Sequence, residues 1–260
     1  MPSEYITVNY DSQDIKVSIK ERINSEHLIL FLHGIACAKE SFDAAFTTPG
    51  LDSYSICTLD FVGFGSSDKP KDFSYKLEGQ AAVVKKVIDQ LAPKTVSIVA
   101  HSLGGATGLL LARQLTNLAH YINVEGNLVT EDCGLITRGT AKQPLDEYEQ
   151  HGFQDFLQLL TSSDRQDFHE WAEWYRLASP NAVHATARSV VKWSDSGKLL
   201  EIFNSLESKT YIYGDEEPKG YLLPRFEKSV DVQYLPNLKH FMMVENPEVF
   251  FSTISKHLVN

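Results

Sequence analysis

A serine between small residues is the clearest candidate for chemistry in this sequence. Ser102 follows an apolar run that begins at Val96, and two glycines follow it within three residues. This order predicts a buried strand, a sharp turn and a helix that begins at once. Small residues two positions before and after the serine, here Ala100 and Gly104, let the backbone pass closely. A serine on such a turn can act as a nucleophile, although a serine at a helix start can also simply cap the helix.

The surroundings of Ser102 resemble the α/β-hydrolase family, whose usual nucleophile pattern is Gly-x-Ser-x-Gly. Ala100 replaces the first glycine, which is a mild departure because alanine is also small. Two further segments are similar to the family: His33-Gly34-Ile35 after an apolar run, and the glycine-rich loop 60–68. The resemblance covers nearly the whole chain, so it implies the fold as well as the site.

The resemblance also implies roles for further residues. His240, in a loop before the final helix, looks like the family's histidine and is expected to take the proton from Ser102. The second oxyanion N–H is expected from Ile35. The first is expected from Leu103, because the turn places its N–H at a helix N-terminus, where the helix dipole favours an anion. His33 is expected to be structural rather than a base.

Two glutamates compete to orient the histidine, a task for which a carboxylate accepts the Nδ1 proton. Glu217 lies in the acidic turn 214–218, where the family more usually carries an aspartate. Glu125 directly follows an apolar strand, and some members of the family carry a glutamate at that position. A carboxylate at the end of a buried strand is costly without a partner, and an imidazole would serve. Glu125 is therefore favoured, with Glu217 as the alternative acid.

Together these residues indicate a hydrolase that cleaves a carboxylic ester, or a related acyl bond, through an acyl-enzyme on Ser102. Carbon-carbon bond hydrolase, thioesterase and lactonase chemistry use the same residues and stay open. A small-molecule sensor that retains the fold is the alternative outside enzymes. No metal and no cofactor is expected.

The elements that would position these residues alternate between strands and helices. An N-terminal pair of strands at 5–10 and 15–19 is predicted to form a hairpin. Short apolar runs then predict strands that are buried on both faces. Helical patterns between them predict an α/β fold, a doubly wound and mostly parallel sheet with helices on both faces. The predicted apolar strands are 28–32, 54–59, 96–100, 121–124, 210–213 and 230–235, and the clearest helices are 77–91, 104–115 and 247–258.

A long helical stretch interrupts this alternation and is interpreted as an inserted cap. The predicted boundaries are a core of 1–127 and 209–260 and a cap of 128–208. The cap is rich in aromatic residues, most of which are expected to pack it onto the core while a few line the pocket. They include Phe153, Phe156, Phe168, Trp171, Trp174 and Tyr175.

Composition excludes several classes of partner. The 24 basic and 34 acidic residues give a net charge of −10, which disfavours nucleic acid because phosphates attract clustered Lys and Arg. The three cysteines form no CxxC pair, so reduced thiols are expected. No signal peptide and no long apolar run is apparent, so a cytoplasmic protein without a membrane partner is expected. A small-molecule substrate is the expected ligand, and a monomer or a homodimer is compatible with the sequence.

Overall fold

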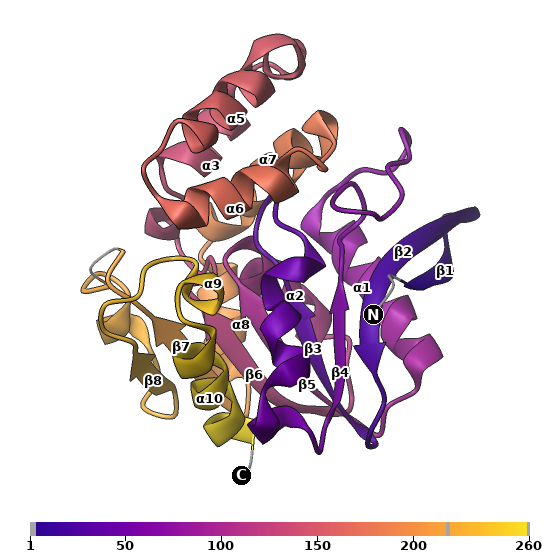
Figure 1. Cartoon of the computed structure of the whole chain (residues 1–260), viewed down its shortest axis with the longest axis vertical. Helices are drawn as coiled ribbons and strands as arrows, with labels where there is room; N and C mark the ends of the chain where they lie inside the picture. The colour runs from indigo at the N-terminus through magenta and orange to yellow at the C-terminus, as the bar shows by residue number, and fades with distance from the viewer. Residues whose placement is uncertain (1–3, 217–218, 259–260) are drawn as a thin grey trace.

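The computed structural model describes residues 4–216 and 219–258 and contains one eight-stranded sheet. The strand order is β1-β2-β4-β3-β5-β6-β7-β8, and all neighbours from β4 onward are parallel (Figure 1). β2 is antiparallel both to β1 and to β4, so the predicted hairpin forms the sheet edge. The strands are β1 (Glu4–Tyr10), β2 (Gln13–Arg22), β3 (His27–Leu32), β4 (Ser55–Leu59), β5 (Thr95–His101), β6 (Leu118–Val124), β7 (Lys209–Tyr213) and β8 (Asp231–Tyr234).

The central strands are buried along almost their whole length, as their apolar sequences predict. Every residue of β4 is buried, and in β3 and β5 only the first residue is not. The edge strand β1, in contrast, has a single buried residue, Val8. The prediction of a mostly parallel, doubly wound sheet with inserted helices is confirmed.

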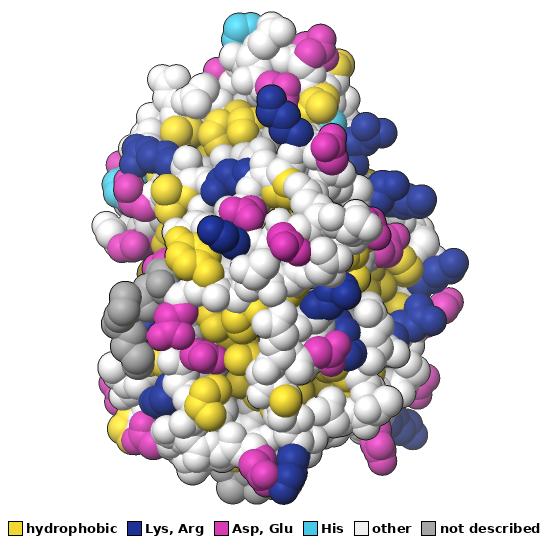
Figure 2. Space-filling model, turned by 90° about the vertical axis from the view of Figure 1, so that its right-hand side faces the viewer, with side chains coloured by type: hydrophobic (Ala, Val, Ile, Leu, Met, Phe, Trp, Pro, Cys, Tyr) yellow, Lys and Arg dark blue, Asp and Glu magenta, His cyan; other side chains and the backbone are white. Residues whose placement is uncertain are grey.

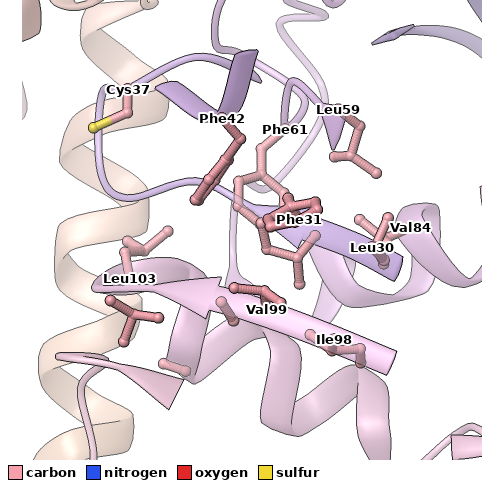
Figure 3. Close-up of a cluster of buried hydrophobic side chains, with 14 of the residues drawn as sticks. Leu30, Phe31, Cys37, Phe42, Leu59, Phe61, Val84, Ile98, Val99 and Leu103 are labelled. Atoms are coloured by element: carbon pink, nitrogen blue, oxygen red, sulfur yellow. The ribbon is translucent and has the colours of Figure 1, made fainter. Parts of the chain in front are cut away.

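Helices cover both faces of the sheet. On one face lie α1 (Leu77–Leu91), α2 (Leu103–Ala112) and α8 (Lys198–Ser205), of which α2 contacts both of the others. The short helix η1 (Lys39–Thr47) packs with α9 (Met242–Glu245) and α10 (Pro247–Leu258) on the other. Neighbouring residues of a strand point to opposite faces of the sheet. The ring centroids of Phe31 in β3 and Phe42 in η1 are therefore 5.1 Å apart, while Leu30 points to the other face (Figure 3). All ten residues of α2 are buried, which makes it the most enclosed helix of the described chain.

Further helices are inserted between β6 and β7. They lie above the sheet in Figure 1, beyond the carboxyl ends of the parallel strands. Helix α8 contacts both α2 and one of the inserted helices, and its Phe203 meets the rings of Tyr121 and Tyr211, so it packs against the sheet as well as against the inserted helices. The predicted core and cap boundaries stay a prediction. The inserted elements are η3 (Thr130–Asp132), α3 (Leu135–Lys142), α4 (Leu145–Glu147), η4 (Tyr148–Gly152), α5 (Phe153–Thr161), α6 (Gln166–Tyr175) and α7 (Pro180–Asp195).

The surface carries charges of both signs. On the face shown in Figure 2, Lys and Arg side chains lie among Asp and Glu side chains and do not gather in one basic area. None of the described helices has the length and apolar character needed to span a membrane.

Candidate active site

Ser102 lies on a strained turn between β5 and α2. Its backbone has φ 53° and ψ −121°, a conformation that residues other than glycine rarely adopt. Hydrogen bonds hold the turn against the end of β6 and the loop that follows it: the Ser102 N–H donates to Val124 O at 3.0 Å, and the Asn127 N–H donates to Ser102 O at 3.2 Å. The strand-turn-helix geometry predicted around this serine is therefore present.

Glycines permit the close approach of these segments. A Cβ at Gly104 would lie 2.5 Å from Leu32 O and 2.6 Å from His33 O, which is too close for any side chain. The start of α2 can therefore pack directly against the end of β3. A Cβ at Gly34 would lie 3.0 Å from the His101 ring, so the loop after β3 also depends on glycine to reach the serine.

Glu125 and His240 form a hydrogen-bonded pair. Glu125 directly follows β6, and its Oε2 lies 2.7 Å from His240 Nδ1. Its other oxygen accepts the Gly214 N–H at 2.9 Å, so both carboxylate oxygens are bonded. The carboxylate side chain is 2% exposed and the imidazole 30% exposed. The buried Glu125 carboxylate thus contacts Nδ1 of the His240 ring, which is partly exposed to solvent.

The surroundings of Glu125 favour its charged form. Burial by itself raises the pKa of a carboxyl group, but the hydrogen bond and charge of His240 outweigh it. The charge of Lys219 and the Gly214 N–H act in the same direction as His240. The net result lowers the pKa of Glu125 from 4.5 to about 2. The carboxylate is therefore ionised at neutral pH and suited to hold a proton on His240 Nδ1.

His101 connects the serine turn to the histidine loop. Its ring is buried beside Ser102, and its Nε2 lies 2.9 Å from the carbonyl oxygen of His240. Because a carbonyl only accepts, Nε2 carries the proton and donates it. Burial, together with the charge of His240, holds the pKa of His101 well below its ordinary value, so this ring stays neutral.

The two expected oxyanion donors flank the serine. Leu103 is the first residue of α2, and Ile35 lies in the turn after β3. Neither the Leu103 N–H nor the Ile35 N–H is hydrogen-bonded to another described part of the chain. His33 is buried, accepts the Phe61 N–H at Nε2 and lies 2.7 Å from Gly34 O through Nδ1. Its ring therefore supports this turn from within the fold.

A cavity of about 390 Å³ brings most of these residues together, although His33 and Leu103 do not line it. Ser102 and His240 both line it, although within residues 4–216 and 219–258 no hydrogen bond joins the serine hydroxyl to the imidazole. Such contacts are often loose in a site without substrate. The Cys37 thiol also lines the cavity, but burial raises its pKa, so it is a poor rival nucleophile at neutral pH. The other lining residues are Gly34, Ile35, His101, Glu125, Asn127, Asp132, Gly134, Ile136, Thr137, Phe168, Trp171, Glu216, Lys219 and Phe241.

Three residues with positive φ stand around this cavity. Ala36, Ser102 and Glu125 have φ values of 51°, 53° and 44°, and they follow β3, β5 and β6 respectively. The left-handed conformation costs roughly 1–2 kcal/mol at a residue with a Cβ. Three of the strained residues of the described chain thus lie after the carboxyl ends of adjacent strands, where α/β sheets bind their ligands.

The alternative acid, Glu217, lies outside the described residues. Its neighbour Glu216 lines the cavity and accepts hydrogen bonds from Arg165, which precedes α6. The same guanidinium also binds Asp167 through two nitrogens. Arg165 therefore joins the inserted helices to the loop after β7.

Sequence reasoning assigned no role in the site to Lys219, and it did not separate Trp171 from the other aromatic residues of the cap. Trp171 of α6 lines the cavity and donates its indole N–H to Ile35 O at 3.1 Å. Lys219 also lines it, lies 3.4 Å from Tyr221 Oη and favours the ionised form of Glu125. The aromatic content of α6 drew attention to Trp171, but no spacing in the sequence separates it from aromatics that only pack. No group of three or more His, Cys, Asp or Glu in the described ranges could hold a metal ion.

Part of the chain is similar to known sequences. Residues 27–133 match a family model described as the alpha/beta hydrolase fold. The putative hydrolase LipZ of Mycobacterium tuberculosis is 37% identical over 126 residues, which cover 46% of this chain and 43% of that protein. The probable lysophospholipase BODYGUARD 2 of Arabidopsis thaliana is 32% identical over 112 residues, which cover 41% of this chain and 24% of that protein. The matched segment spans less than half the length of each relative.

Comparison with solved structures covers the whole chain. The N-acyl homoserine lactonase AidH, complexed with N-butanoyl homoserine, has a TM-score of 0.79 and 14% identity, over 98% of this chain and 96% of that one. A thermophilic esterase from Thermogutta terrifontis has a TM-score of 0.76 and 15% identity, over 99% of this chain and 98% of that one. At such low identity the likeness shows the fold alone.

Proposed function

Because the chain has the α/β-hydrolase fold, we propose that it is a serine hydrolase that cleaves a carboxylic ester or a related acyl bond of a small molecule. The observation that carries the proposal is the Glu125–His240 pair, joined at 2.7 Å and set beside the cavity that Ser102 lines. A buried carboxylate, a partly exposed imidazole and a strained serine form the arrangement that acyl transfer requires.

In the first step, Ser102 Oγ attacks the acyl carbonyl carbon and His240 Nε2 takes the hydroxyl proton. Glu125 keeps Nδ1 protonated, so that Nε2 is the nitrogen free to accept, and it stabilises the imidazolium that forms. The Leu103 and Ile35 N–H groups stabilise the negative charge on the carbonyl oxygen. The bond to the leaving alcohol then breaks, and the alcohol takes its proton from His240.

In the second step, water attacks the acyl-enzyme while His240 Nε2 takes a proton from it. The tetrahedral intermediate collapses, Ser102 regains its proton from His240, and the carboxylic acid is released. The same residues serve both steps, so their positions need not change between them. The buried and neutral His101, which donates to the carbonyl of His240, supports the histidine loop through both.

Labelling with a fluorophosphonate probe, combined with a panel of nitrophenyl esters of increasing acyl length, tests the proposal. We expect stoichiometric labelling and measurable ester hydrolysis in the wild type, and loss of both in Ser102→Ala. Ser252→Ala, which changes an exposed serine of α10, is the matched control and should retain both. Since one structural neighbour is described as a lactonase, a lactone belongs in the panel.

The outcomes separate the proposal from its rival. Absence of labelling in the wild type would contradict a reactive Ser102 and with it the proposed mechanism. Labelling without turnover on any ester or lactone would instead support a small-molecule sensor that retains a reactive serine. Turnover on esters that survives in Ser102→Ala would place the nucleophile elsewhere.

A further inference from the structure

The indole of Trp171 makes a hydrogen bond from the inserted helices to the turn that carries an expected oxyanion donor. Trp171 Nε1 lies 3.1 Å from Ile35 O, and the side chain is almost fully buried. The same ring lies 5.3 Å from the ring of Phe241, the neighbour of His240. One side chain of α6 thus contacts both loops that, under the proposed function, hold the catalytic groups.

The turn after β3 has a backbone conformation that is unfavourable for alanine, the residue at its third position. Gly34 to Cys37 form a β-turn in which the Cys37 N–H donates to Gly34 O at 3.2 Å. Ala36, the third residue, has φ 51°. Positive φ at this position is the mark of a type II turn, which normally has glycine or asparagine there. In a type I turn the same residue has negative φ, and the Ile35–Ala36 peptide is flipped over.

The Trp171 hydrogen bond favours the observed form. A flip of the Ile35–Ala36 peptide would relieve the strain at Ala36, but it would carry Ile35 O away from the indole N–H and break the bond. The Cys37 thiol, at 3.5 Å from Ile35 O, is only a weak donor. The indole is therefore the stronger of the two side-chain donors that hold this carbonyl in the described structure.

Helix α6 is itself fixed to the core close to Trp171. Arg165 precedes the helix and binds both carboxylate oxygens of Glu216 in the loop after β7, at 2.7 and 3.0 Å. Its guanidinium also stacks on the ring of Phe168, 4.1 Å from the centroid. The helix that carries Trp171 is thus anchored to Glu216, another residue that lines the same cavity, which restrains the position of the indole.

We propose that Trp171 is a positioning residue: its indole N–H fixes the Ile35 carbonyl and thereby keeps Ile35, whose own N–H belongs to the preceding Gly34–Ile35 peptide, in place for the oxyanion. This inference rests on the proposed function for its catalytic consequence, but not for its effect on the turn. It gives the inserted helices a part in stabilising the transition state, in addition to enclosing the substrate.

The first test compares two phenylalanine variants. Trp171→Phe keeps a ring against Phe241 but lacks the N–H, and we expect kcat to fall about tenfold, equivalent to about 1.4 kcal/mol, while KM changes less than twofold. A boronic acid that forms a tetrahedral adduct on Ser102 should bind more weakly by the same factor. Trp193→Phe is the matched control, because it loses an indole hydrogen bond to Glu78 that lies outside the cavity. It should leave kcat and boronate binding unchanged.

The second test asks whether the turn is the point of action. Glycine adopts positive φ without strain, so adding Ala36→Gly to Trp171→Phe should recover most of the lost kcat. Hydrogen exchange of the 34–37 amides should be faster in Trp171→Phe than in Trp193→Phe whether or not the protein turns over an ester. Unchanged exchange in Trp171→Phe would overturn the proposal at the turn. Faster exchange with unchanged kcat and boronate binding would overturn its catalytic part, and absence of fluorophosphonate labelling in the wild type would count against the proposed function alone.

Discussion

At the scale of single residues, the site depends on one buried carboxylate. Glu125 could be selected from the sequence, because a carboxylate that ends a buried strand needs a partner and a histidine was available. The preference over Glu217 could not be decided from the sequence, since an acidic turn near the expected position is compatible with both roles. The Glu125–His240 distance of 2.7 Å now supports the preference, and activity measurements are its direct test.

The first prediction concerns the identity of the acid. Glu125→Gln keeps the size of the side chain but removes the charge that holds His240 in the reactive tautomer, so we expect ester turnover to fall about 10³- to 10⁴-fold. Glu217→Gln should retain turnover within about twofold, a margin below what loss of a charged hydrogen bond would cost. Steady-state kinetics on one nitrophenyl ester is sufficient. The reverse pattern would assign the role to Glu217.

A second prediction at this scale concerns stability against pH. The pKa of Glu125 is about 2 in the folded protein and near 4.5 when unfolded, so its ionised form stabilises the fold above pH 4.5. This contribution, about 3 kcal/mol, is lost as the pH falls from 4.5 towards 2. Urea unfolding should therefore show a steeper loss of stability between pH 5 and pH 3 in the wild type than in Glu125→Gln. Parallel pH profiles for the two proteins would refute the low pKa.

At the scale of elements, patterns with clear end signals were predicted best. The predicted helices 77–91 and 247–258 coincide with α1 and α10, where Pro93 follows one and Pro247 begins the other. Strand β6 begins at Leu118, three residues before the predicted start, because its first three residues are not buried and His120 interrupts the apolar run. Helix α2 ends at Ala112, although its apolar pattern continues to Leu115.

A third prediction concerns the contact of α2 with β3. Gly104→Ala would place a Cβ 2.5 Å from Leu32 O and 2.6 Å from His33 O, so the start of the helix must move away from the strand. We expect the free energy of unfolding to fall by about 2 kcal/mol or more. Gly139→Ala, in the exposed part of α3 with nothing within 4 Å of the added Cβ, should instead raise it by about 0.5–1 kcal/mol. Urea denaturation of both variants measures the contrast, and equal effects would argue against a tight contact at Gly104.

At the scale of the whole molecule, the sheet was predictable and the placement of the inserted helices was not. Alternating strands and helices determine a parallel sheet through general rules of handedness and burial. The orientation of α6 over the site depends on particular contacts, such as Arg165 with Glu216 and Trp171 with Ile35. Those contacts join residues far apart in the sequence, and no periodic pattern in the sequence predicts them.

A fourth prediction concerns this connection between the inserted helices and the core. Arg165→Gln removes the ion pairs with Glu216 and Asp167, so hydrogen exchange in α6 should become faster by up to about fivefold. Arg138→Gln is the matched control, because Arg138 makes a similar two-nitrogen pair with Asp195 but joins α3 to α7 within the inserted region. Its exchange in α6 should be that of the wild type. Equal rates in all three proteins would show that the Arg165 contacts do not hold the helix.

The three residues with positive φ at the strand ends have a consequence for laboratory evolution. Glycine at position 36 or 102 would relieve the backbone, so a selection for thermal tolerance alone should favour it at both. Glycine at position 125 would also remove the buried carboxylate that stabilises the fold, so it should not be favoured there. Ser102→Gly would abolish the proposed chemistry, whereas Ala36→Gly leaves the reacting side chains in place. Selections for heat resistance and for turnover should therefore enrich different residues at position 102, and this divergence could be read from deep sequencing of one library.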